Sequence, residues 1–215
     1  MQIQRSFTNF ATMGNKLHDY VWTAILAGIS IGIAAVCNLK GGIYIGALLF
    51  AFGLSAVVCS KWRLFTGGIG FVNSWKSFLW ILLALAANIL GAAMSSCFGY
   101  CIGGDAIMMA ADNIVDIRIS MLEEPLKLIL MSAGCGFIMT VSVKHARERQ
   151  WIPLLFGIPT FVMCGFPHCV ADIVYYCNCS SLTVDCLYAW LYTVLGNTIG
   201  CNLPTLERFF QKQKI

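Results

Sequence analysis

The chain has 215 residues, of which 59% are hydrophobic and 11% are charged, and its formal net charge is +4 at pH 7. Soluble globular domains carry about 45–50% apolar and about 25% charged residues. So few charges cannot cover a water-facing surface, which excludes a conventional soluble enzyme, a disordered chain and a collagen-like chain. Because the apolar residues come in long runs, the sequence predicts an integral protein of the lipid bilayer. The small net charge gives no indication of nucleic-acid binding.

Six apolar segments are long enough to cross a bilayer, whose hydrocarbon core needs about 20 helical residues. They are, in chain order, residues 20–38, 42–60, 77–100, 125–143, 151–176 and 182–203. The sequence therefore predicts an all-α membrane protein with a six-span domain over residues 20–204, between tails at 1–19 and 205–215. The first tail has no apolar core followed by a small-residue cleavage site, so we expect a cytosolic tail rather than a signal peptide.

The basic residues indicate how the spans are oriented. Eleven lie on one side of the predicted spans: Arg5, Lys16, Lys61, Arg63, Lys76, Lys144, Arg147, Arg149, Arg208, Lys212 and Lys214. Three lie on the other side: Lys40, Arg118 and Lys127. Because cytoplasmic loops carry the excess of Lys and Arg, both termini are predicted to be cytoplasmic, with the chain in the inner or plasma membrane of the cell. An even number of spans agrees with this orientation.

Two of the predicted spans are interrupted. The second is followed by the polar, Gly-rich stretch KWRLFTGG at residues 61–68, and the fifth contains GFPHCVAD at residues 165–172. Pro167 lacks a backbone N–H and its ring clashes with the preceding turn, so a helix should kink or end there. Interrupted helices at corresponding positions in two halves of a chain indicate a transport site, and their free N–H groups favour an anion. The alternative is a simple Pro kink and a polar surface loop, with Lys61 and Arg63 marking the cytosolic rim.

His168 is the most informative residue of the interrupted fifth span. An ionisable group in a span is costly and usually functional, and imidazole can exchange a proton near neutral pH. Two alternatives stay open. His168 could be a neutral core residue bonded to a backbone carbonyl. It could also share a metal ion with Cys164 and Asp172 at helical spacing, which Pro167 disfavours because it breaks the helix.

Eleven cysteines are present, and most lie inside apolar segments, where Cys behaves as a small hydrophobe. Cys177, Cys179 and Cys186 share one short predicted loop. Two of them could form a disulfide if that loop faces an oxidising compartment, and the sequence leaves this open.

Three short motifs resemble those of one family of membrane proteins. Residues 63–67 read RLFTG, close to that family's ELFTG; residues 165–172 read GFPHCVAD, close to GFEHSIAN; and residues 196–201 read GNTIGC, close to GNxIGG. On these motifs the chain resembles the formate/nitrite transporter family. The resemblance implies an aquaporin-like inverted repeat of three plus three spans with broken second and fifth helices, assembled as a homo-pentamer that carries small monovalent anions.

The resemblance also implies roles for particular residues. His168 and Thr66 fall in the central pore, with His168 as the proton donor. The other positions are apolar constrictions at Phe50, Leu54, Leu64 and Phe161, an anion-vestibule cation at Arg118 or Lys127, and helix-break support at Gly67, Gly68, Pro167, Asp172 and Asn197. The family pattern implies no cofactor and no metal.

The chain departs from the family pattern at several of these places. Arg63 stands for an acidic residue, Lys61 for a small one, Pro167 for Glu and Asp172 for Asn. Formate is therefore not assumed to be the substrate.

The predicted function is a membrane channel or transporter for small monovalent anions of the formate, nitrite or hydrosulfide class, with proton donation from His168. A neutral-solute channel for water or ammonia on a similar bundle is the first alternative. The second is a membrane-embedded enzyme that uses His168 with Cys164, Cys169 or Asp172. The enzyme is disfavoured because the spans offer no second His and no evident nucleophile paired to a base.

Overall fold

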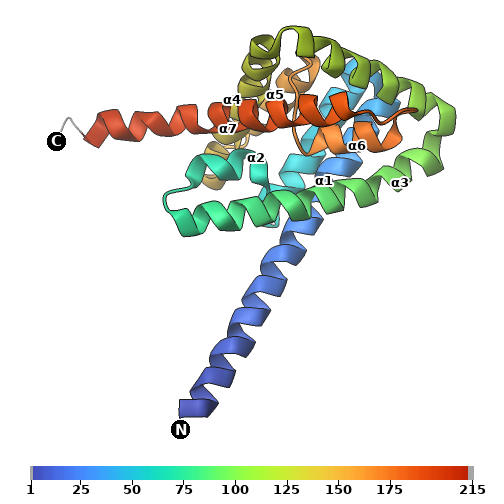
Figure 1. The fold of residues 1–215 in the computed structure, drawn as a ribbon. Helices are drawn as coiled ribbons and strands as arrows, with labels where there is room; N and C mark the ends of the chain where they lie inside the picture. The colour runs from blue at the N-terminus through green and yellow to red at the C-terminus, as the bar shows by residue number, and fades with distance from the viewer. Residues whose placement is uncertain (1, 213–215) are drawn as a thin grey trace.

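The computed structural model describes the backbone of residues 2–212 and the side chains of residues 16–206, and it consists of helices joined by short connections (Figure 1). In chain order the elements are α1 (Gln2–Cys59), α2 (Phe65–Gly68), the 3-10 helix η1 (Ile69–Phe71), α3 (Trp75–Ser120), the 3-10 helix η2 (Met121–Glu123), α4 (Pro125–Arg147), α5 (Ile152–Met163), α6 (Ala171–Asn178) and α7 (Val184–Lys212). The described backbone contains no strand, so the all-α prediction is confirmed. The side chains of Arg5, Arg208, Lys212 and Lys214, which contribute to the predicted orientation, lie outside the described residues.

The first two predicted spans are the two halves of α1, which folds back at Gly42. Gly42 has φ 68° and ψ −176°, a conformation open to glycine because it has no Cβ. On either side of this kink the halves lie against each other. Ser30 donates a hydrogen bond to the carbonyl oxygen of Gly53 at 3.1 Å, and Asn38 lies next to Gly46. The chain therefore forms a helical hairpin here.

α3 is longer than the span predicted from the sequence, which ends at residue 100. A second kink at Gly104, with φ 45°, lets the chain continue in helical conformation to Ser120. Hydropathy hides this extension because Asp105 and Asp112 interrupt the apolar run. The extension carries Arg118 to a buried position in the last turn of α3.

Three described helices are long and apolar enough to cross a membrane, over residues 16–59, 75–123 and 125–147, and α5 is a shorter apolar helix. Large apolar side chains are exposed around them, including Tyr44, Trp75, Tyr100, Leu126 and Phe156. An apolar surface this extensive is typical of contact with lipid. The finer prediction of six spans in an inverted repeat stays a prediction.

Glycines let the helices pack closely in two pairs, α1 with α3 and α4 with α7. A Cβ on Gly91 of α3 would collide with the backbone oxygen of Ile25 in α1. A Cβ on Gly200 of α7 would collide in the same way with the backbone oxygen of Ala133 in α4. Small residues permit this approach between helices in a membrane, where van der Waals packing drives association.

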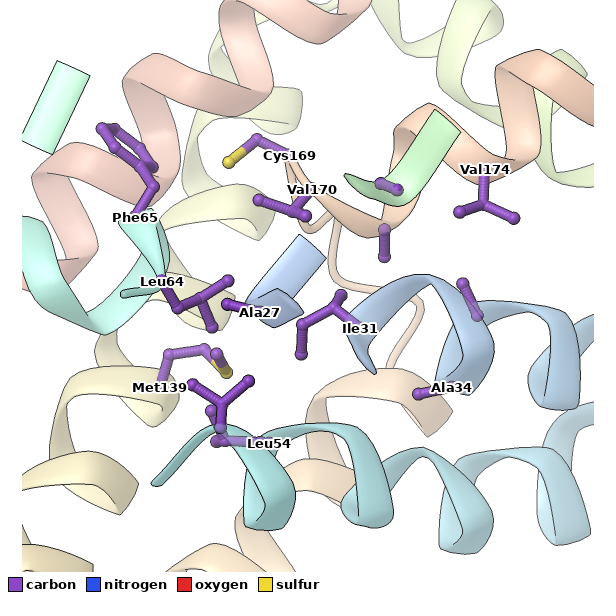
Figure 2. Close-up of a cluster of buried hydrophobic side chains, with 14 of the residues drawn as sticks. Ala27, Ile31, Ala34, Leu54, Leu64, Phe65, Met139, Cys169, Val170 and Val174 are labelled. Atoms are coloured by element: carbon purple, nitrogen blue, oxygen red, sulfur yellow. The ribbon is translucent and has the colours of Figure 1, made fainter. Parts of the chain in front are cut away.

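The buried core lies between these helix pairs, where the irregular segments of the chain meet. Figure 2 shows Leu54 of α1, Leu64 before α2, Met139 of α4 and Val170 before α6 beside Ile31 of α1. All five side chains are buried. Protein therefore encloses the segments before α2 and before α6, which is the condition under which irregular backbone is tolerated at membrane depth.

Candidate functional site

Two segments of irregular backbone meet inside the helix bundle. The first joins α1 to α2 and holds Leu64 in an extended conformation with φ −107° and ψ 135°. The second follows the end of α5 at Met163 and includes Gly165, whose φ is 67°. Thr66 and Cys169 join the two segments, with 3.5 Å between the hydroxyl oxygen and the sulfur. Both interruptions expected from the sequence are present, and they lie against each other.

Asn197 of α7 ties the second segment to the bundle. Its Nδ2 donates hydrogen bonds to the carbonyl oxygens of Pro167 at 2.9 Å and Ser132 at 2.8 Å. Its Oδ1 accepts a hydrogen bond from the backbone N–H of Cys169 at 2.9 Å. The buried Asn197 therefore fixes the peptides on both sides of His168.

Asn88 of α3 ties the first segment in the same way. Its Nδ2 donates to the carbonyl oxygens of Arg63 at 2.8 Å and Ala24 at 2.7 Å. Its Oδ1 accepts from the backbone N–H of Phe65 at 2.8 Å. Asn88 thus fixes the peptides on both sides of Leu64, so Leu64 and His168 occupy matched positions in the two segments.

Sequence reasoning missed Asn88, although a signal was present. Asn88 is the single polar residue in the apolar run LLALAANILGAA of the third predicted span. A buried amide must find hydrogen-bond partners. An isolated Asn in a predicted span could therefore have indicated nearby irregular backbone.

The His168 imidazole is buried and oriented. The residue is 2% exposed, and its Nδ1 accepts a hydrogen bond from the backbone N–H of Ala171 at 3.1 Å. Because Nδ1 is the acceptor, the neutral ring carries its proton on Nε2. Nε2 has no hydrogen-bond partner among the described residues. The ring stacks on Phe161 with 5.9 Å between centroids, so one donor is held in place without a protein acceptor.

A cavity of about 420 Å³ lies beside the imidazole, and we refer to it as the His168 cavity. Five predicted site residues line it: Phe50, Arg118, Phe161, His168 and Asp172. Phe50 and Phe161 meet edge to face there, with ring centroids 5.6 Å apart. The structure therefore brings two of the four predicted constriction residues to the side of His168.

Arg118 in this cavity is paired with a carboxylate. Its Nη1 donates to the carbonyl oxygen of Gly165 at 3.1 Å, and its Nε lies 3.6 Å from Oδ2 of Asp172. Both side chains are buried. Lys127, the alternative vestibule cation, is an exposed residue that pairs with Glu124 at 3.8 Å and does not line the cavity. Of the two cations named from the sequence, the structure brings only Arg118 to His168.

A second cavity of about 940 Å³ lies on the other side of the irregular segments, and we refer to it as the Arg63 cavity. Its lining includes the predicted site residues Leu54, Leu64, Thr66 and Gly68, together with Arg63 and Arg147. The four predicted constriction residues therefore divide into two pairs, one at each cavity.

Gly67 has a bonding role that the sequence did not indicate. Its φ of 85° is in the left-handed region, which favours glycine. Its backbone N–H donates to the sulfur of Cys201 in α7 at 3.2 Å. Gly67 therefore supports the helix break, and its amide is directed to the protein.

The cysteines give no disulfide within the part of the chain that the structure describes; Cys177, Cys179 and Cys186 are all free. Partial burial raises the pKa of the Cys179 thiol, which disfavours the thiolate needed for disulfide exchange.

The metal alternative has no support in residues 16–206, which contain no group of three or more His, Cys, Asp or Glu side chains that could hold an ion. Its geometric premise also fails. The helix ends at Met163, so Cys164, His168 and Asp172 do not share one helix face.

The family model for the formate/nitrite transporters matches residues 8–206. The chain belongs to the formate/nitrite transporter family. A solved structure described as a pentameric formate channel with formate bound matches with a TM-score of 0.80 and 16% identity, covering 94% of this chain and 99% of that chain. An ion channel of the same family matches with a TM-score of 0.81 and 15% identity, covering 93% of this chain and 92% of that one.

Comparison with curated proteins finds no match. The family and the structural neighbours are channels and transporters, not enzymes. At 15–16% identity the structural matches establish the fold of this transporter-family member and not its substrate.

Proposed function

We propose that this family member is a channel or transporter for small monovalent anions of the formate, nitrite or hydrosulfide class, with the Nε2–H of His168 as the central donor. The observation that carries the proposal is the orientation of that donor. Ala171 engages Nδ1, no described residue engages Nε2, and the ring lines a cavity where two broken helices meet. Such a donor stabilises a passing anion by a hydrogen bond or by transfer of its proton.

The apolar residues define the proposed route. Phe50 and Phe161 stand at the His168 cavity, and Leu54 and Leu64 stand at the Arg63 cavity. A bare anion pays a large desolvation cost in such surroundings and is stabilised when it becomes neutral. Protonation at His168 would therefore let a weak acid cross both apolar layers.

Thr66 is the second proposed donor. Its hydroxyl is buried, lines the Arg63 cavity and lies 3.5 Å from Cys169 Sγ. A hydroxyl can rotate between a sulfur and a passing anion because it offers one donor and two acceptor lone pairs. Thr66 would then receive the solute on the side opposite His168.

The proposed architecture is an inverted repeat of three plus three spans, over residues 20–204, with both termini cytoplasmic. The matched hydrogen bonds of Asn88 and Asn197 support it, since each ties an irregular segment to two helices of its own half. Pro167 and Asp172 are the proposed supports of the second break. α5 ends at Met163, before the left-handed Gly165, and Pro167 beyond it has no backbone N–H to donate to a helix. Asp172 pairs with Arg118.

We also propose a homo-pentamer, because a similar structure is described as a pentameric formate channel. The exposed apolar side chains offer surface for both lipid and neighbouring protomers. Mass measurement of the protein extracted into lipid nanodiscs tests this. Five chains per particle are expected, and a monomer in both detergent and nanodiscs would contradict it.

One observation favours a second candidate, a channel for neutral solutes such as water or ammonia. Arg118 in the His168 cavity is paired with Asp172, so this cation is neutralised rather than open to an anion. A path without net charge would not discriminate in favour of anions.

Proteoliposome uptake separates the two candidates. Formate, nitrite, hydrosulfide and ammonia would be supplied at an acidic and a neutral pH, with and without a membrane potential, and empty liposomes would be the control. We expect anion-dependent uptake that is faster at acidic pH, because protons assist passage. Uptake of ammonia alone, independent of pH and potential, would favour the neutral-solute channel.

A further inference from the structure

The Arg63 cavity differs in charge from the His168 cavity. Its lining includes Tyr20, Lys61, Trp62, Arg63, Trp80 and Arg147. None of its described lining residues is Asp or Glu, whereas Asp172 lines the His168 cavity beside Arg118. The Arg63 cavity is therefore a concave surface whose charged groups are all positive.

The two arginines of this cavity are held by aromatic rings. The Arg63 guanidinium lies 5.5 Å from the ring centroid of Tyr20, and that of Arg147 lies 4.5 Å from the centroid of Phe71. Such contacts restrict the side chain and leave the edge of the guanidinium able to donate hydrogen bonds. Neither guanidinium forms an ion pair with a carboxylate within residues 16–206.

The backbone of Arg63 is also fixed. Asn88 donates to its carbonyl oxygen at 2.8 Å, and the next residue, Leu64, is buried and lines the cavity. The backbone of Arg63 is thus held next to the apolar Leu64, and its side chain is exposed. A neighbouring cavity of about 490 Å³ shares Tyr20, Lys61, Arg63 and Trp80 and adds Lys16, so positive charge continues outward. That cavity also contains Asp19, which lies 3.6 Å from His18.

We propose that Arg63 and Arg147 form a binding site for a phosphate group at the mouth of the Arg63 cavity. Guanidinium groups match the oxygens of phosphate through paired, charge-assisted hydrogen bonds. Two of them balance the charge of a phosphate dianion. The cavity of about 940 Å³ has room for more than a three-atom anion, and the buried Leu54, Leu64 and Thr66 are part of its lining.

A bound phosphate would stand over the apolar layer and close it from this side. A dianion cannot follow a small monovalent acid through that layer, because removing its water costs far more and one proton does not neutralise it. The site would therefore hold its ligand without carrying it. This inference goes beyond the proposed transport function, because binding at the Arg63 cavity does not require permeation.

Equilibrium binding of isotope-labelled inorganic phosphate tests the site. The full chain would be placed in nanodiscs of phosphatidylcholine, and Arg63→Gln, Arg147→Gln and the double variant would be compared with Lys76→Gln. Lys76 is an exposed cation of α3 that lines neither cavity. We expect one phosphate per chain, a loss of about tenfold in affinity for each arginine removed, and no loss for Lys76→Gln.

Arg63→Lys and Arg147→Lys keep the positive charge at each position and remove only the planar guanidinium with its paired N–H donors. They should weaken binding less than the Gln variants. Phosphate binding of equal affinity in all variants would overturn the proposal, and so would the absence of binding both to inorganic phosphate and to the phosphatidic acid described below. Because the readout is binding, a failure of transport leaves this test unaffected.

The phosphate group could belong to a soluble ion or to a lipid headgroup, and a second set of nanodiscs distinguishes them. Phosphatidic acid would be added to the bilayer. Binding of inorganic phosphate in phosphatidylcholine alone identifies a soluble ligand. Retention of phosphatidic acid that is lost in the double arginine variant identifies a headgroup. If the folded protein binds neither inorganic phosphate nor phosphatidic acid, the proposed site is overturned.

Discussion

The two irregular segments of this transporter-family member are held by the same pattern of Asn hydrogen bonds and differ in the residue that stands between the bonded peptides. In each, one buried Asn donates to the carbonyl before the central residue and accepts from the N–H after it. The central residue is Leu64 in one segment and His168 in the other. The same Asn hydrogen bonds therefore occur in both segments, but only the second segment has a titratable side chain, His168, at its central position. The Asn side chains therefore fix backbone geometry in both segments, and under the proposed function only His168 can exchange a proton there.

The charges around the two segments differ as well. Beside His168, Arg118 is buried and paired with Asp172. Beside Leu64, Arg63 is exposed and contacts the ring of Tyr20. One arginine is thus part of the internal structure, and the other is available to solutes.

The largest loss of stability should come from removing the hydrogen bonds of either Asn88 or Asn197. Asn197→Leu and Asn88→Leu each remove three hydrogen bonds to the backbone, of which one in each case goes to a carbonyl inside a helix and two go to the irregular segment. A buried group left unsatisfied costs about 1–3 kcal/mol. We expect both variants to lose several kcal/mol of stability, by similar amounts. Thermal unfolding in detergent, followed by the loss of the native oligomer, measures this. A variant of Asn88 as stable as the unmodified chain would show that the two sets of Asn hydrogen bonds are not equivalent.

Breaking the ion pair between Arg118 and Asp172 should have the next largest effect on stability, whereas removing Arg63 near the first segment should have none. Arg118→Gln leaves the carboxylate of Asp172 buried and unpaired, which typically costs about 3–5 kcal/mol. The matched variant Arg63→Gln should leave stability unchanged because Arg63 is exposed. Thermal unfolding compares the two.

The double variant Arg118→Gln with Asp172→Asn is the control for that experiment. It removes the orphaned charge, so it should recover most of the lost stability. Equal destabilisation by Arg118→Gln and Arg63→Gln would contradict the distinction between a structural and an accessible arginine.

The smallest effect should come from trimming the apolar layer on the side of His168. Phe50→Leu keeps an apolar side chain and removes the edge-to-face contact with Phe161, so the layer widens. We expect a severalfold rise in anion uptake and weaker discrimination between small anions, measured in proteoliposomes. Leu79→Ala, on an exposed position of α3, is the control. Unchanged uptake and selectivity would exclude Phe50 from the constriction.

Much of this site could be predicted because it depends on local backbone rules. Pro167 cannot continue a helix and residues 61–68 are polar and Gly-rich, so both breaks are visible in the sequence, although α5 ends at Met163, before the left-handed Gly165. The resemblance to the family placed His168 and Asn197. Asn88 belongs to none of the quoted motifs, and its role depends on the loop that folds back onto α3.

The choice between Arg118 and Lys127 could not be made from the sequence because it depends on tertiary geometry. The kink at Gly104 and the helix that continues to Ser120 bring Arg118 inside, whereas Lys127 in the first turn of α4 stays at the surface. Arg118 lies between the third and fourth predicted spans, and Lys127 lies at the start of the fourth, so position along the chain does not separate them. The pairing of Arg118 with Asp172 joins residues 54 positions apart, and no local pattern indicates it.

The most direct test of the role of His168 gives both irregular segments the same central residue. His168→Leu copies Leu64 into the second segment, and the ties of Asn197 remain because they involve only backbone groups of Pro167, Ser132 and Cys169. His168→Asn serves as a partner variant that can still accept from the Ala171 N–H but cannot exchange a proton near neutral pH. In proteoliposomes the account predicts that both variants keep their oligomeric size and that anion uptake falls to the rate of empty liposomes. Uptake by a folded His168→Leu variant at the rate of the unmodified chain would contradict it.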